Sequence, residues 1–179
     1  MSEQNKPQPV QTEALAALRT QIDSLDRQLL ALLNQRARVA EQVGELKRQE
    51  GSPFFRPDRV AQVIEKIQNA NEGPLLNAHV AAIWREIMSA CLAQQEPLKV
   101  GYLGPGGTFS QHAAQKHFGH SAHGLPLASI EEVFQEVESG NADFGVVPVE
   151  NSGQGTIQVT LDLFLTSPLK ICGEVELRV

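Results

Sequence analysis

TEALAALRTQIDSLDRQLLALLNQRARVAEQVGELKRQE, residues 12–50, is the longest periodic stretch of this sequence. It contains no proline and one glycine, Gly44, and its apolar side chains recur every three or four residues. These apolar side chains are Leu15, Leu18, Ile22, Leu25, Leu29, Leu32, Leu33, Val39, Val43 and Leu46. The spacing predicts one amphipathic helix, roughly 58 Å long at 1.5 Å per residue. Because a small domain cannot cover so long a stripe, we expect a second copy to cover it in an intertwined homodimer.

Two shorter helices are expected after the long one. The residues GSPFFRPDR interrupt the pattern, and Pro57 suits the first turn of a second helix that runs to about Ala70. A turn at residues 71–74 precedes a third helix over about residues 77–95. We therefore expect an all-helical domain at residues 12–96, preceded by a disordered tail at residues 1–11.

The second half of the chain alternates between strand and helix patterns. Apolar strands are expected at residues 98–103, 144–149 and 169–179, and a helix is expected through Ile157, Leu161 and Leu165. Such alternation predicts a parallel α/β sheet, so the expected fold is an all-α three-helix domain followed by a partial α/β lobe at residues 97–179.

Two capping boxes mark further helices in this second half. Thr108 with Gln111 predicts a helix that ends near Gly119, and Ser129 with Glu132 predicts one that ends near Gly140.

Composition excludes several functions. The net charge of −6 argues against non-specific nucleic-acid binding, and 41% hydrophobic residues are enough for a packed core. Apolar runs are too short for a transmembrane helix, and the polar N-terminus does not resemble a secretory signal. Cys91 and Cys172 lack a CxxC partner, which fits a reducing compartment, so we expect a cytoplasmic protein. The histidines have no carboxylate at ligand spacing, so no metal is expected.

Cationic side chains interrupt the apolar faces of the helices. Arg36 and Lys47 are 11 residues apart and share a face of the long helix, with Cα atoms about 16 Å apart. Arg19 points roughly 100° away and could serve the site of another copy. With Arg59 and Gln95 they would line a cationic cavity suited to a small dianion. Alternatively, the charged side chains are solvated or pair with acidic residues at helical spacing.

The helical part resembles a known family. The runs ALRTQIDSLDRQLLALLNQRARVAEQVGELK and FFRPDRVAQV, with the helix that ends at Gln95, are similar to the all-helical class of chorismate mutase. The resemblance implies a dimer that converts chorismate to prephenate by a pericyclic rearrangement, without a cofactor. It implies that Arg36 and Arg59 bind the substrate carboxylates, together with Arg19 of the partner chain. It also implies that Lys47 and Gln95 donate hydrogen bonds to the ether oxygen.

This sequence departs from the family pattern at two positions. Val60 replaces the usual glutamate, which contacts the substrate hydroxyl, and Arg56 stands near the place of an aspartate. Gln94 is an alternative to Gln95, because the register is uncertain by one residue.

Two strings in the second half carry another resemblance. A glycine-rich turn after a strand can present N–H groups to an anion, although it is equally typical of an ordinary strand–helix turn. The strings GYLGPGGTFSQ, residues 101–111, and VPVENSGQG, residues 147–155, resemble the first two motifs of prephenate dehydratase, which forms phenylpyruvate, water and carbon dioxide. The resemblance places five residues in a prephenate cleft: Thr108, Ser110, Glu150, Asn151 and Ser152.

Together the two parts resemble the bifunctional chorismate mutase–prephenate dehydratases of phenylalanine biosynthesis. The Thr-Arg-Phe motif of that family does not occur here. We therefore expect a chain that corresponds to the N-terminal part of a longer protein, with no dehydratase activity alone. The alternatives are a non-catalytic anion-binding α/β lobe with a helical dimerisation domain, and a purely structural helical dimer.

Overall fold

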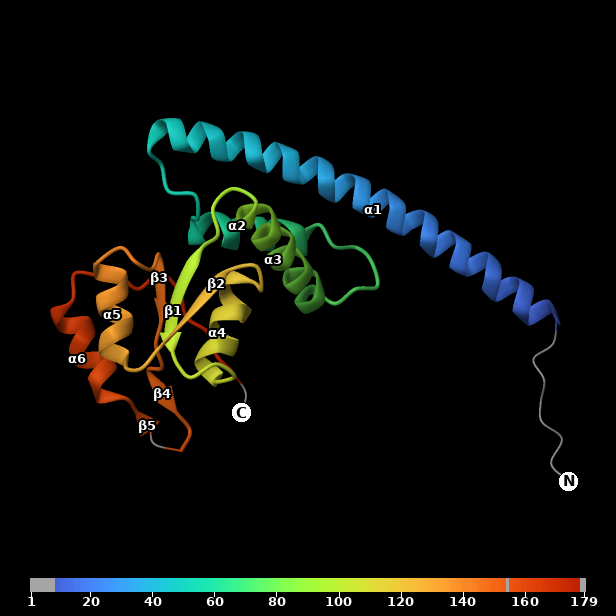
Figure 1. Cartoon of the computed structure of the whole chain (residues 1–179). Helices are drawn as coiled ribbons and strands as arrows, with labels where there is room; N and C mark the ends of the chain where they lie inside the picture. Colours follow the sequence, from blue (N-terminus) through green and yellow to red (C-terminus); the bar gives the residue numbers. More distant parts are fainter. Residues whose placement is uncertain (1–8, 154, 178–179) are drawn as a thin grey trace, which may run out of the picture. The chain divides into compact units, whose positions relative to one another are not determined.

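A computed structural model describes residues 9–153 and 155–177 of the chain (Figure 1). Its contacts form two compact units, residues 1–39 and residues 40–179. The boundary expected near Glu96 is not decided by this division and stays a prediction.

The long helix α1 spans Pro9–Glu50, so the predicted single helix is confirmed. It begins three residues earlier than expected, and residues 9–11 are therefore helical rather than part of a disordered tail. Proline is tolerated at the first helical position because the N–H it lacks has no partner there. The rest of the expected tail, residues 1–8, lies outside the described residues.

The end of α1 reverses the chain direction. The Gly51 N–H donates to the Arg48 carbonyl at 3.3 Å, and the Ser52 N–H donates to the Lys47 carbonyl at 2.9 Å. This is a Schellman motif, and Gly51 adopts the left-handed φ of 65° that the motif requires. The following residues, 51–56, form the α1–α2 linker.

Two shorter helices follow, as predicted. Helix α2 spans Pro57–Asn69 and packs against α3, which spans Asn77–Ala93. The third helix ends two residues before its expected end, because the Gln95 N–H donates to the Leu92 carbonyl at 2.9 Å and tightens the last turn.

The second half forms the predicted parallel α/β sheet. Strand β1, Lys99–Leu103, lies between β2, His123–Leu127, and β3, Phe144–Val146, and pairs with both in parallel. Helices α4, Phe109–Phe118, and α5, Ile130–Glu138, flank the sheet on either side (Figure 1). The α/β core contains Leu98, Val100, Ala114 and Phe118.

The strands predicted from the sequence differ from the observed ones in two ways: some observed strands were not predicted, and one predicted strand does not form among the described residues. Strand β2 was not predicted, because its Gly124 and Pro126 are poor strand formers and are accommodated at the edge of the sheet. The two-residue strands β4, Glu150–Asn151, and β5, Gly155–Thr156, were also missed. Helix α6 spans Gln158–Thr166 and matches its prediction.

The strand expected at residues 169–179 is wrong for the part that the structure describes. Residues 167–177 have no strand conformation, because an apolar pattern makes a strand only where a neighbouring strand accepts its hydrogen bonds. The strand expected over residues 144–149 ends at Val146 for lack of pairing beyond it. Residues 178–179 lie outside the described residues.

One of the two predicted capping boxes is confirmed and the other is wrong. Ser129 Oγ accepts a hydrogen bond from the Glu132 N–H at 3.2 Å, as predicted for α5. Thr108 does not cap α4 with its side chain, because its hydroxyl donates to the Leu103 carbonyl at 3.2 Å. Gln111 instead accepts from the N–H of Gly107 at 2.6 Å, one residue before the expected position.

Candidate active site

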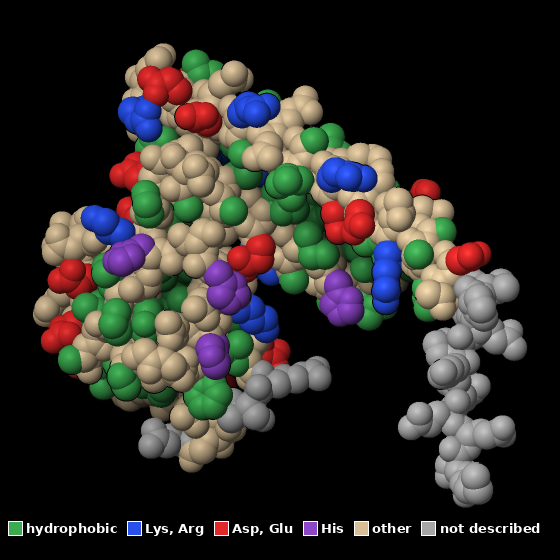
Figure 2. Space-filling view, turned by 45° about the vertical axis from the view of Figure 1, so that its right-hand side comes forward, with side chains coloured by type: hydrophobic (Ala, Val, Ile, Leu, Met, Phe, Trp, Pro, Cys, Tyr) green, Lys and Arg blue, Asp and Glu red, His purple; other side chains and the backbone are tan. Residues whose placement is uncertain are grey.

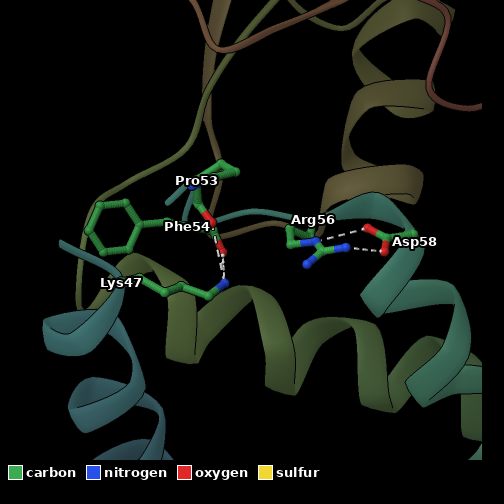
Figure 3. A network of polar contacts seen from close by, with 5 residues as sticks. All are labelled: Lys47, Pro53, Phe54, Arg56 and Asp58. Carbon is green, nitrogen blue, oxygen red and sulfur yellow. Dashed lines mark hydrogen bonds and ion pairs between the residues drawn. The ribbon is translucent and has the colours of Figure 1, made fainter. Parts of the chain in front are cut away.

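Lys47 lies near the end of α1 and is half-buried. Its Nζ donates to the carbonyl oxygens of Pro53 at 3.3 Å and Phe54 at 3.0 Å (Figure 3). Because the Schellman motif turns the linker back along α1, these carbonyls come within reach of the ammonium group. An ammonium has three N–H donors, so one remains for another acceptor. The site thus presents a positively charged donor whose direction is restricted by two backbone carbonyls.

Gln95 contacts the same helix close to Lys47. Its Nε2 donates to the Ala40 carbonyl at 2.8 Å and to the Cys91 carbonyl at 3.5 Å. Gly44 makes this approach possible, because a Cβ at Gly44 would come within 2.0 Å of Gln95 Oε1. Gly44 and Lys47 are three residues apart and therefore neighbours on the helix surface. The structure thus brings two of the predicted site residues, Lys47 and Gln95, to one face of α1.

Gln94 and Gln95 differ in their surroundings. Gln94 is the C-cap residue of α3 and is exposed, whereas Gln95 is half-buried against α1. Both amide hydrogens of Gln95 already face carbonyl oxygens, so donation to a substrate requires it to give up the longer of its two bonds. The role of either glutamine in a site stays a prediction.

The start of α2 carries Arg59, which is exposed in the first helical turn. Just before it, Arg56 pairs with Asp58 through Nη2 to Oδ2 at 2.7 Å and Nε to Oδ1 at 3.3 Å (Figure 3). The hydrogen bond from Arg56 holds the pKa of the Asp58 carboxyl below its ordinary value. Val60 is half-buried and offers no side-chain hydrogen-bond acceptor, so the departure expected from the sequence is a real chemical difference.

The other two arginines predicted for the site, Arg19 and Arg36, belong to the first compact unit. In that unit Arg19 is exposed and Arg36 is half-buried. Their roles toward a carboxylate stay predictions.

The polar loops of the α/β lobe follow neighbouring strands. Residues 104–108 come after β1 and residues 147–152 come after β3, and the carboxyl ends of adjacent parallel strands meet at one edge of a sheet. The Asn151 side chain accepts a hydrogen bond from the Gly153 N–H at 2.7 Å, which orders the second loop. The structure therefore brings the two predicted groups to the same sheet edge: Thr108 and Ser110 from one, and Glu150, Asn151 and Ser152 from the other.

Sequence reasoning missed the groups that hold Lys47 and Gln95. The carbonyls of Pro53, Phe54 and Ala40 are backbone atoms, so no residue type signals them. Gly44 did carry a signal, because a lone glycine inside a helical pattern usually has a packing reason.

The described residues contain no group of three or more potential metal ligands. Among the same residues, no helix combines the length and the apolar character needed to cross a bilayer.

The fold and the site define a chain with two parts of different class. The helical part carries cationic and amide donors, and the parallel α/β lobe carries two polar loops at one sheet edge. Residues 18–96 match the family model "Chorismate mutase type II", and residues 100–179 match the model "Prephenate dehydratase". The chain thus combines a chorismate mutase type II part with a prephenate dehydratase part, as the sequence resemblance predicted.

Named relatives agree with this assignment. Two proteins named bifunctional chorismate mutase/prephenate dehydratase are similar along most of the chain. The one from Stutzerimonas stutzeri is 52% identical over 94% of this chain and 48% of its own length. The one from Pseudomonas aeruginosa is 54% identical over 93% of this chain and 47% of its own length. The chain thus spans about half the length of the curated relatives it matches. A solved chorismate mutase from Thermus thermophilus is 29% identical, covers 46% of this chain and 94% of its own, and has a TM-score of 0.46.

Proposed function

We propose that the helical part converts chorismate to prephenate by a pericyclic rearrangement, with Lys47 as the principal electrostatic donor. The observation that carries this proposal is the Lys47 ammonium, held by the Pro53 and Phe54 carbonyls with one N–H left over. As the C–O bond of chorismate breaks, its ether oxygen gains negative charge. A donor that is already oriented stabilises that charge without reorganising.

The other predicted residues complete this site. Arg36 and Arg59 bind the substrate carboxylates, with Arg19 supplied by a second copy, and Gln95 is the second donor to the ether oxygen. Binding both carboxylates holds the flexible substrate in its folded, reactive conformer. The reaction moves electrons within one molecule, so the proposed mechanism uses no cofactor and no metal.

A homodimer is part of this proposal. The ten predicted apolar side chains of α1 are solvent-exposed, with exposed fractions from 38% at Leu33 to 62% at Leu32, and hydrophobic side chains reach the surface along the helix (Figure 2). Burying the exposed half of ten such side chains contributes about 1 kcal/mol each, or on the order of 10 kcal/mol from each copy. Association costs about 4–15 kcal/mol, so two copies together have enough apolar surface to pair.

We further propose that the α/β lobe contributes to a prephenate site through its two loops at the sheet edge. The Ser110 hydroxyl and the Asn151 amide N–H groups offer hydrogen bonds to an anionic substrate, whereas the Thr108 hydroxyl must first give up its bond to the Leu103 carbonyl. Water loss from prephenate needs a general acid within hydrogen-bond reach of the leaving hydroxyl, and the Thr-Arg-Phe motif is absent from this sequence. This chain by itself is therefore expected to form no phenylpyruvate.

We place the activity in phenylalanine biosynthesis and in the cytoplasm. Prephenate and phenylpyruvate are successive precursors of phenylalanine. Cys91 and Cys172 form no disulfide with each other, which is consistent with a reducing compartment.

One pair of assays tests the whole proposal. Chorismate consumption and phenylpyruvate formation are followed with the purified chain, the second starting from prephenate at neutral pH. Chorismate loss in proportion to protein, without phenylpyruvate, is the expected result. Binding of prephenate without chorismate loss would instead favour a non-catalytic anion-binding lobe on a helical dimerisation domain.

A further inference from the structure

The α1–α2 linker contacts two different parts of the second compact unit. Its Pro53 and Phe54 carbonyls accept the hydrogen bonds of Lys47 Nζ, and the Phe54 ring lies under the Arg48 guanidinium, 5.6 Å from ring centroid to Cζ. The next residue, Phe55, packs against the core of the α/β lobe. The Phe54 carbonyl lies between the Cα atoms of Phe54 and Phe55, which are a fixed distance of about 3.8 Å apart. A shift of Phe55 therefore also moves the Phe54 carbonyl.

Phe55 is held in the α/β lobe by an aromatic cluster. Its ring centroid lies 5.4 Å from that of Phe118 and 5.2 Å from that of Phe144, with interplanar angles of 52° and 77°. Phe118 and Phe144 are themselves 5.2 Å apart, so the three rings contact one another pairwise. Tilted and edge-on arrangements of this kind are favourable for aromatic rings and restrict how each ring can move.

A second contact fixes α3 against the same lobe. Gly119, at a φ of 84°, lies so close to Ser89 that a Cβ there would come within 2.4 Å of the Ser89 Cβ. Beside it, Glu86 accepts hydrogen bonds from His120 through the backbone N–H at 3.1 Å and pairs with its Nδ1 at 2.8 Å. The α/β lobe therefore contacts the helical part at two places, at the linker and at α3. These contacts leave the aromatic rings around Phe55 little freedom to move.

We propose that Phe55 is a positioning residue for the mutase step: the α/β lobe holds the linker through Phe55, and the linker carbonyls in turn orient the Lys47 ammonium. The inference rests on the proposed function, in which Lys47 donates to the ether oxygen. Misplacing a catalytic group by about 1 Å can cost about 100-fold in rate. The α/β lobe therefore serves chorismate rearrangement as well as prephenate binding.

The experiment compares Phe55→Ala with Phe134→Ala in the full chain. Phe134 is a matched control, because it is a buried phenylalanine of the same lobe whose ring packs on Phe164 at 5.4 Å, outside the ring cluster of Phe55, Phe118 and Phe144. We expect Phe55→Ala to lower kcat by about 10- to 100-fold with little change in KM. Phe134→Ala should leave both constants near those of the unsubstituted chain.

A double-mutant cycle shows whether Phe55 acts through Lys47. In a Lys47→Ala background the substitution of Phe55 should cause no further loss of kcat, because the group that it positions is gone. An unchanged kcat in Phe55→Ala, or losses that multiply in the double variant, would overturn the inference while leaving the proposed function in place. If Phe55→Ala does not fold, as judged by far-UV circular dichroism, Phe55→Leu replaces it in the same cycle.

Amine acylation read by mass spectrometry gives a measurement that does not need activity. The acylation rate of Lys47 relative to the exposed Lys66 should rise several-fold in the Phe55 variant and stay constant in Phe134→Ala. A chain without any mutase activity would refute the proposed function, and the acylation ratio would still decide whether Phe55 holds Lys47. A ratio that does not change would overturn the inference.

Discussion

Gly44→Ala should lower the mutase activity of the chain while leaving its stability nearly unchanged. The methyl group would lie 2.0 Å from Oε1, 2.5 Å from Cδ and 3.1 Å from Cγ of Gln95, so the Gln95 side chain must leave its present position. The chain then loses the 2.8 Å hydrogen bond to the Ala40 carbonyl, which contributes about 1 kcal/mol. Replacing a glycine inside a helix by alanine stabilises the folded chain by about 0.5–1 kcal/mol.

These two changes nearly cancel, so the free energy of unfolding should stay within about 1 kcal/mol of the original value. If Gln95 donates to the ether oxygen, its displacement should lower kcat by about 100-fold or more, as the loss of one preorganised donor does in other enzymes. Urea unfolding and steady-state chorismate consumption measure the two quantities on the same sample.

Gln95→Ala is the control that tests the mechanism. Without the glutamine side chain the methyl group meets none of those three atoms, so Gly44→Ala added to Gln95→Ala should stabilise the chain by about 0.5–1 kcal/mol and leave kcat as in the single variant. A Gly44→Ala chain with full kcat would refute the reasoning, and the same assay on Gln94→Ala would then test the other glutamine.

The remaining predictions concern catalysis, assembly and acid stability. Lys47→Ala should lower kcat by about 100- to 1,000-fold, and near-normal activity would place Lys47 outside the site. Val60→Glu should raise kcat/KM if the substrate hydroxyl lacks a partner, and an unchanged value would mean that another group contacts it. Light scattering at micromolar concentration should show a dimer, and a well-folded monomer would exclude the role of Arg19 in a shared site. Burial raises the pKa of Glu86, but the hydrogen bonds from His120 outweigh it and hold the pKa below its ordinary value. The ionised carboxylate therefore contributes stability above its unfolded-state pKa of about 4.3, and this is lost as the pH falls through the folded-state pKa. Glu86→Gln should thus flatten the dependence of unfolding free energy on pH below about 4.3, and a curve parallel to that of the original chain would contradict this.

The local sequence pattern was sufficient to predict an element whose hydrogen bonds lie within the element itself. The periodicity of residues 12–50 predicted α1, and Ser129 with Glu132 predicted the start of α5, because helix hydrogen bonds and caps connect residues only a few positions apart. The motif residues around Thr108 and Asn151 were enough to indicate the family that the comparisons show.

Local pattern was insufficient where a strand depends on its neighbour. HGLPL, residues 123–127, forms β2 despite its glycine and proline, because β1 supplies the partner edge. Residues 169–177 have a strand-like pattern but pair with no strand in the described chain, and they therefore form none.

The sequence by itself therefore determined the class of each part, the helices and the family, along with the identity of the charged residues. The tertiary structure alone decided what orients them. Lys47 is held by backbone carbonyls, Gln95 reaches the Ala40 carbonyl 55 residues away, and Phe55 joins rings that come from α4 and β3. Backbone oxygens look alike in every residue, and contacts between distant residues form only when the chain has folded, so no local pattern could have shown them.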